Sequence, residues 1–278
     1  MTTTRSIEGA VAGPVDSRAR QVHPSAGVRN VAAAAAGRRP SILRLTGIEL
    51  RKSVDTRSGR VLLLVVLGLG FAGLAWRLVN AQNTPVTFEH YLGTSMIGVQ
   101  LVLPIVGLMA MTSEWTQRTA LSTFTSTPRR GRILTAKVAS ALLLGTVLTA
   151  LIIVLGWAAT LLGGAITGTE PVFDGALKLA AGVMIANLLN LLMASAFGAL
   201  IPLTAAAIVA FLVAPQLWGA AGTALFKDAA QWLDVYGAFG RIVSFKWVDL
   251  PQTATSITAW IILPLVVGVV LSLRREVK

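Results

Sequence analysis

The chain has 278 residues, of which 54% are hydrophobic and only 13% are charged. Soluble domains carry about 25% charged residues, so lipid rather than water must cover much of this surface. The sequence contains no cysteine, which excludes disulfides and thiolate metal sites. The net charge of +12 does not indicate a nucleic-acid partner, because most basic residues lie in a tail and in loops beside apolar segments, where a membrane surface explains them.

Residues 1–40 are rich in Ala, Arg, Pro and Gly and show no apolar periodicity. This composition is typical of disordered segments, because too little apolar surface is available to offset the entropy of folding. The first residues also lack the basic stretch and apolar core of a cleaved signal peptide. We therefore predict a disordered cytoplasmic tail over residues 1–40.

Residues 41–60 combine Ile, Leu and Val with many charges, and they are too polar to span a bilayer. The pattern predicts an amphipathic helix in the cytoplasmic interface, whose basic side chains reach the lipid headgroups. Leu43, Leu50 and Val54 share one apolar stripe, whereas Ile48 falls outside it. The charged residues of interest in this segment are Glu49, Arg51, Lys52 and Arg57.

Residues 61–278 contain six apolar stretches, each close to the roughly 20 residues that cross about 30 Å of hydrocarbon. The predicted fold is an all-α membrane protein, a bundle of six transmembrane helices preceded by the interfacial helix. Pro202 separates the fourth stretch from the fifth, and if it only bent one long span the chain would have five spans. The stretches run approximately over 61–79, 91–112, 137–162, 177–199, 203–225 and 255–273.

The distribution of Lys and Arg favours six spans. With the N-terminus inside, 19 of the 24 basic residues face the cytoplasm: eleven before the first span, five between the second and third, and three in the C-terminal tail. Lys and Arg, rather than net charge, set the orientation of membrane proteins. We therefore predict a multi-pass protein of the plasma membrane with both termini in the cytoplasm.

Four amide side chains fall inside the predicted spans. Unpaired amides are costly in hydrocarbon, so we expect them in the bundle interior or a cavity. They either line a substrate path or form interhelical hydrogen bonds worth about 0.6 kcal/mol each, and packing is the preferred interpretation. No ionisable group lies at the centre of a span, which disfavours proton-coupled transport. The four residues are Gln100, Asn187, Asn190 and Gln216.

The connection between the fifth and sixth spans carries aromatic residues at helical spacing. Trp232, Tyr236 and Phe239 recur at i, i+4 and i+7, which predicts an aromatic stripe on a short helix at the outer interface. An anchoring belt is the preferred interpretation, and guidance of an amphipathic substrate is the alternative.

The connection between the second and third spans reads SEWTQRTALSTFTSTPRRGRILTAK over residues 113–137. An acidic residue, a Thr-containing short helix, a Pro-Arg segment and a Lys that opens the next span follow one another. In this order the chain resembles the permease subunits of ABC-2-type transporters over residues 41–278. Arg118 stands where that family usually has Gly. The matching positions are Glu114, Thr119, Pro128, Arg129, Arg130 and Lys137.

The resemblance implies that two permease chains, identical or related, pair in the bilayer and that each docks a separate cytosolic ATPase. Residues 114–124, including Leu121 and Phe124, would form the helix that couples to the ATPase, with ATP and Mg²⁺ bound by that partner. The chain contains no Gly-Lys pair and hence no P-loop of its own. No catalytic residue, cofactor or metal is therefore assigned to it. The family is mostly exporting, which implies outward movement of a hydrophobic or amphipathic compound.

Two other function classes stay open from the residues alone. An intramembrane hydrolase would need a nucleophile and base, paired carboxylates or a metal cluster within the bundle. Glu89 and Glu114, the acids nearest the span boundaries, lie at opposite faces in the six-span topology. A non-catalytic membrane anchor or sensor subunit is the third possibility. In that case the loop arginines would serve only to keep this loop in the cytoplasm. They are Arg129, Arg130 and Arg132.

Overall fold

The structure, a computed structural model, describes residues 41–116 and 130–274. The predicted tail over 1–40 lies outside these ranges. Within them the regular structure is helical, apart from one isolated β-bridge between Thr87 and Val172. The expected all-α fold is confirmed.

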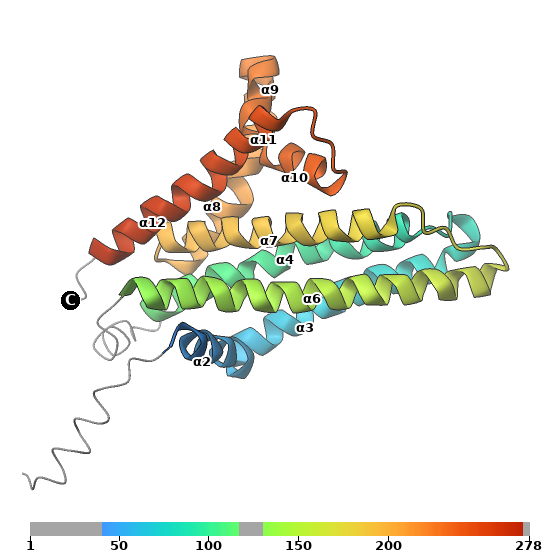
Figure 1. The fold of residues 1–278 in the computed structure, drawn as a ribbon, viewed down its shortest axis with the longest axis horizontal. Helices are drawn as coiled ribbons and strands as arrows, with labels where there is room; N and C mark the ends of the chain where they lie inside the picture. The colour runs from blue at the N-terminus through green and yellow to red at the C-terminus, as the bar shows by residue number, and fades with distance from the viewer. Residues whose placement is uncertain (1–40, 117–129, 275–278) are drawn as a thin grey trace, which may run out of the picture. The chain divides into compact units, whose positions relative to one another are not determined.

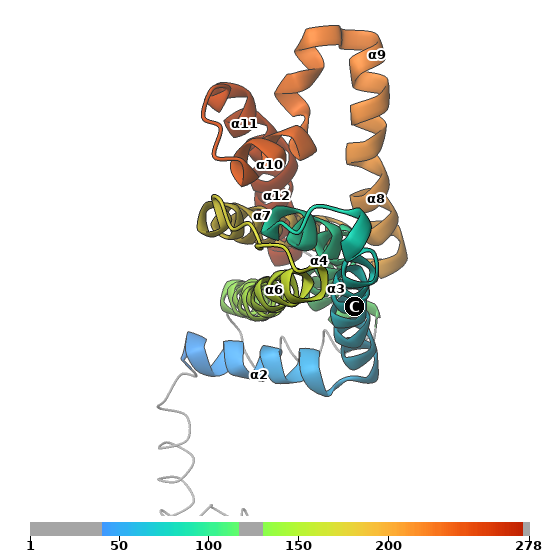
Figure 2. The same ribbon diagram turned by 90° about the vertical axis from the view of Figure 1, so that its right-hand side faces the viewer.

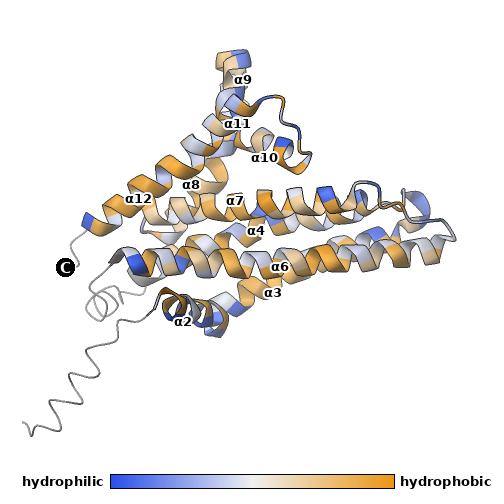
Figure 3. Ribbon diagram, viewed as in Figure 1, coloured by the Kyte–Doolittle hydropathy of each residue, from blue (hydrophilic) through white to orange (hydrophobic). Residues whose placement is uncertain are grey.

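Six helical segments are long and apolar enough to cross a membrane, and apolar residues cover most of their length (Figure 3). The chain is therefore a multi-pass membrane protein with the predicted number of spans. The segments are α3 (Arg57–Val79), α4 (Phe88–Thr116), α6 (Arg130–Thr167), α7 (Ala176–Leu200), the stretch Thr204–Leu233 with α8 (Thr204–Leu217) and α9 (Thr223–Phe226), and the stretch Leu250–Arg274 with α11 (Leu250–Ile257) and α12 (Leu263–Arg274).

The chain breaks at Pro202, as six spans require. α7 ends at Leu200 and α8 begins at Thr204. Ile201 is extended, with φ −113° and ψ 108°, because the proline ring excludes the helical conformation from the residue before it. The amide of Ile201 still donates to the Phe197 carbonyl (2.9 Å) and so closes the last turn of α7. The five-span alternative is thereby excluded.

A short helix, α2 (Ile42–Asp55), precedes the spans. Thr56 is extended and its hydroxyl accepts a hydrogen bond from the Gly59 amide (3.2 Å), which caps the start of α3. The predicted interfacial helix therefore ends at Asp55, and Arg57 belongs to the first turn of α3. Figure 2 shows α2 lying across the ends of α3 and α6 instead of running along them.

Several of the spans begin or end at the end of the bundle where α2 lies. The last turn of α4, the first turn of α6 and the last turn of α12 reach the same end (Figure 1), which we call the α2 end of the bundle. α6 has 38 residues, so it is about 57 Å long and exceeds the hydrocarbon thickness of about 30 Å. The predicted stretch, 137–162, is shorter than the helix at both ends, because residues 130–136 and 163–167 continue the helix beyond it.

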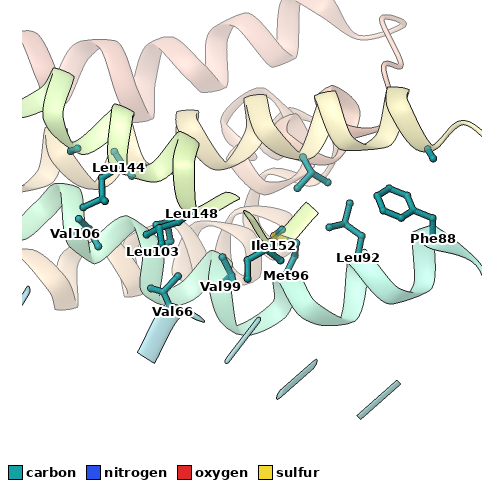
Figure 4. Close-up of a cluster of buried hydrophobic side chains, with 14 residues drawn as sticks. Val66, Phe88, Leu92, Met96, Val99, Leu103, Val106, Leu144, Leu148 and Ile152 are labelled. Carbon is teal, nitrogen blue, oxygen red and sulfur yellow. The ribbon is translucent and has the colours of Figure 1, made fainter. Parts of the chain in front are cut away.

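α4 runs through the centre of the core. Its apolar residues recur every three or four positions and face α3, α6 and α7, so that one stripe of α4 packs against several helices (Figure 4). Gly107 lies directly against Leu191 and Ser195 of α7, and this close approach needs a residue without a side chain. The α4 members of this cluster are Phe88, Leu92, Met96, Val99, Leu103 and Val106.

The connection between the last two spans folds back onto α7. Its helix α10 (Val235–Val243) begins after Asp234, whose side chain caps it by accepting from the Gly237 amide (2.9 Å). Trp232 lies before this cap, in the 3-10 helix Lys227–Leu233. Phe239 is buried, whereas Trp232 and Tyr236 are exposed. The predicted single aromatic stripe is therefore wrong, because a capped boundary separates its members and α7 buries one of them.

Both final spans contain a π-helical turn beside a proline. The turn Trp218–Gly222 follows Pro215, and the turn Thr258–Ile262 precedes Pro264. A proline removes one helical hydrogen bond, and a π turn accommodates the defect locally. The indole N–H groups in both turns donate to backbone carbonyls of the 3-10 helix: Trp218 to Ala230 (3.1 Å) and Trp260 to Leu233 (2.7 Å). These two hydrogen bonds thus hold both final spans to the 3-10 helix in their connection.

Candidate functional site

A buried ion pair lies at the α2 end of the bundle. The Lys137 ammonium, on α6, lies 2.9 Å from the Glu49 carboxylate of α2 and donates to the Ala110 carbonyl of α4 at 3.0 Å. Lys137 is only 2% exposed and Glu49 only 8%. One side chain therefore joins three helices that are far apart in the sequence.

The second oxygen of Glu49 accepts a hydrogen bond from Lys52, one turn further along α2 (2.6 Å). Burial by itself would raise the pKa of Glu49, but the ammonium groups of Lys137 and Lys52 outweigh it and hold the pKa below its ordinary value. The carboxylate is therefore charged at neutral pH. Two charges removed from water are stable only when they are well paired, and this geometry supplies the pairing.

The apolar stripe of α2 meets the bundle only at Leu50, which packs against the core. Glu49 is buried, whereas Leu43 and Val54 of the stripe are exposed. At 100° per residue the stripe lies about a third of a turn away from Glu49. α2 is thus attached through the Glu49 carboxylate and Leu50, while Leu43 and Val54 are left free for lipid.

The structure brings together residues that the sequence placed in separate groups. Glu49 and Lys52 belong to the predicted interfacial helix, whereas Lys137 belongs to the predicted coupling loop, 88 residues from Glu49. Arg51, on the same helix as Glu49, is exposed. The signal that could have linked the pair is that each charge stands at an otherwise apolar or small-residue position and needs a buried partner.

The structure describes only part of the rest of the predicted coupling loop. Glu114 lies in the last turn of α4 and Arg130 begins α6, so both belong to the α2 end. The other residues proposed for this loop lie outside the described ranges: Arg118, Thr119, Leu121, Phe124, Pro128 and Arg129.

The two asparagines of α7 are buried against neighbouring helices. The Asn187 amide donates to the Thr149 hydroxyl of α6 at 3.4 Å. The Asn190 amide donates to the backbone carbonyl of Gln100 in α4 at 3.0 Å. The side chains of Gln100 and Gln216 are exposed, unlike the interior position expected for them. The asparagine contacts agree with a packing role, since each amide holds α7 against another helix.

A second buried cation lies at the opposite end of α3. Arg77 is nine-tenths buried, donates to the Pro85 carbonyl (3.3 Å) and stands over the ring of Tyr91, 5.5 Å from its centroid. The Tyr91 hydroxyl is pressed against Gly163 of α6. These contacts close the end of the bundle remote from α2. Within the described ranges, no three His, Asp or Glu residues are grouped so as to hold a metal ion.

The ion pair should make the attachment of α2 sensitive to acid. Because the pKa of Glu49 is lowered on folding, its contribution is complete above the ordinary carboxyl pKa of about 4.3. It is lost as the pH falls through the lower folded value. Hydrogen exchange of residues 42–55 should therefore accelerate below about pH 4 more than exchange of α7. In Glu49→Gln this extra acid response should vanish, and its persistence there would assign it to another group.

Comparison with known proteins adds no relative. No family model, no curated protein and no solved structure matches the chain significantly. The arguments about function therefore rest on the residues and on the geometry at the α2 end.

Proposed function

We propose that this chain is the membrane-spanning subunit of an ABC-2-type transporter that exports a hydrophobic or amphipathic compound. In this proposal two permease chains pair in the plasma membrane, and each binds a separate cytosolic ATPase. ATP and Mg²⁺ are bound by that partner, and the chain described here transmits the movement to the spans.

The orientation in the proposal is supported by the distribution of charge. α2, the end of α4, the start of α6 and the end of α12 share the α2 end (Figure 1). Together with the tail, the loop and the C-terminus that continue from them, these elements contain most of the Lys and Arg residues. Because basic loops stay in the cytoplasm, the α2 end is the cytoplasmic end, and both termini lie inside the cell.

The observation that carries the proposal is the position of Lys137. It follows the 114–130 connection by two turns of helix and binds both Glu49 of α2 and Ala110 of α4. A partner that displaces this connection would therefore move α2, α4 and α6 together. An ATPase can bias the bundle in this way only if its contacts with the connection differ between its open and closed states.

The test is co-purification from the membrane. The full chain, solubilised in detergent, should retain a soluble ATPase that contains a P-loop. Glu114→Lys should reduce the bound ATPase and the ATP-dependent transport, because it reverses the charge at the start of the connection. Glu170→Lys is the matched control, since this exposed acid lies in the α6–α7 connection at the opposite end and should leave binding unchanged.

The possible outcomes separate two parts of the proposal. If no ATPase is retained by the wild-type chain under any condition, the transporter assignment is wrong. If an ATPase is retained and both binding and transport survive deletion of residues 114–124, the transporter assignment stands and the coupling role of this segment is wrong.

A further inference from the structure

Three arginines of α2 and of the first turn of α3 have no ion-pair partner among the described residues. Arg44 and Arg51 lie on α2 and Arg57 lies in the first turn of α3, and all three are exposed. Within residues 41–116 and 130–274 no carboxylate lies at ion-pair distance from them. Their neighbour Arg60, in contrast, reaches Asp55 at 3.7 Å.

The positions of these arginines on the helices are not random. Arg44 and Arg51 are seven residues apart and so share one face of α2, about a quarter turn from the apolar stripe and nearly opposite Glu49. α2 therefore has three faces: a carboxylate toward the bundle, an apolar side, and a cationic side. Arg57 adds a cation at the N-terminus of α3, where the helix dipole disfavours positive charge. A bound anion would relieve that repulsion.

Exposed apolar side chains lie close in the chain to these arginines, at both ends of α2. Leu43 of α2 is 84% exposed, and Val61 and Leu64 in the early turns of α3 are 61% and 68% exposed. α2 lies across the end of α3 (Figure 2), so cations and apolar side chains meet at one level along the bundle. Figure 3 shows the same change from hydrophilic to hydrophobic residues where α2 passes into α3.

We propose that this surface of α2 and the start of α3 binds anionic phospholipids of the adjacent leaflet. The headgroup phosphates would lie along the arginines, one on the face of α2 that carries Arg44 and Arg51 and one on Arg57 at the start of α3, and the acyl chains would follow the exposed apolar residues of α2 and α3. Guanidinium groups suit this ligand, because their planar N–H groups match the oxygens of a phosphate. A neutral lipid with the same chains lacks the net charge that the three arginines require.

Such a lipid would hold α2 from the side opposite the ion pair. Glu49 attaches the helix to α6 through Lys137, while the arginines attach it to the membrane surface. α2 would then transmit the state of the leaflet to the α4 and α6 ends. The lipid site itself does not depend on the proposed transport function.

The experiment compares lipids retained by the full-length protein. The chain is reconstituted with equal amounts of phosphatidylglycerol and phosphatidylcholine of identical acyl chains, extracted in mild detergent, and analysed by native mass spectrometry. The wild type should retain phosphatidylglycerol preferentially. Each basic residue near an anionic surface strengthens binding about fivefold, so the triple variant Arg44→Gln, Arg51→Gln, Arg57→Gln should lose that preference by more than tenfold.

Two controls keep the result interpretable. A second triple variant, Arg18→Gln, Arg20→Gln, Arg29→Gln, removes the same charge from the N-terminal segment and should keep the preference. Arg51→Gln alone should weaken it by about fivefold and serves if the triple variant does not fold. Equal retention of both lipids by the wild type, loss with the N-terminal variant instead, or impaired ATPase capture without any lipid effect would each overturn the proposal.

Discussion

Replacing Lys137 with Met should lower the free energy of unfolding by about 3–5 kcal/mol and detach α2 from the bundle. The Glu49 carboxylate would remain buried without its main cation, and an unpaired buried charge is far more costly than a missing apolar contact. The measurement is thermal unfolding of the detergent-solubilised protein, together with hydrogen exchange of residues 42–55. Amide hydrogen exchange in α2 should become as fast as in a helix that does not pack against the bundle.

Double replacement distinguishes a charge effect from a loss of packing. Glu49→Gln combined with Lys137→Met removes both charges and should recover most of the lost stability, because no ion is left unpaired. Lys246→Met, which removes an exposed lysine, should leave the unfolding temperature unchanged. If the double variant is as unstable as the sum of the two single variants, the ion pair does not hold α2.

Gly182→Ala should separate α10 from α7 and destabilise the protein by about 1–3 kcal/mol. A Cβ atom at this position would overlap the backbone of Val243, both its carbonyl oxygen and its Cα, the latter at 2.7 Å. Backbone atoms cannot rotate aside as a flexible side chain can, so the whole of α10 must shift. The buried residues of α10, Phe239 among them, would lose contact with α7.

The matched control lies on the other side of the same contact. Gly240 belongs to α10, and a Cβ atom added there meets no atom within 4 Å. Gly240→Ala should therefore be neutral or slightly stabilising, since alanine is favoured over glycine in a helix by about 1 kcal/mol. Thermal unfolding measured on both variants decides the matter. If Gly182→Ala is as stable as Gly240→Ala, the close approach of Gly182 to Val243 does not determine the stability of the α7–α10 contact.

The buried asparagines and the ion pair place polar contacts at different levels of the same bundle. Asn187 and Asn190 hold α7 against α6 and α4 within the spans, whereas Glu49 and Lys137 hold α2 at one end. α4 takes part at both levels, through the carbonyls of Gln100 and Ala110. A displacement of α4 at the α2 end would thus also displace α7. The α10–α12 region contacts α7 as well.

Much of the fold follows from local properties of the chain. Apolar stretches of about 20 residues predict spans because hydrocarbon excludes unpaired backbone groups, whatever the neighbouring helices are. Pro202 predicts a break because its ring acts on the adjacent residue. The apolar stripe of α2, with Ile48 outside it, also depends only on helical periodicity. For these reasons the number of spans, their order and the break after α7 are all confirmed by the structure.

The features that sequence patterns did not predict depend on contacts between distant residues or on helix caps. Apolar periodicity does not register a cap, so the boundary at Thr56 and the start of α10 after Asp234 were missed. Gln100 and Gln216 are exposed and do not lie in the packed interior of the bundle, because a mid-span amide can face outward and only the packing of helices decides which side it takes.

The sequence by itself determined that this is a six-span membrane protein with an amphipathic helix before the first span, because hydropathy, periodicity and proline act over a few residues. Only the tertiary structure decided that Glu49 meets Lys137, that Gly182 admits the backbone of Val243, and that α2 lies across the bundle with its arginines exposed. Each of these depends on how helices far apart in the chain approach one another. That approach is set by side-chain shape and charge summed over whole interfaces, which no single stretch of residues contains.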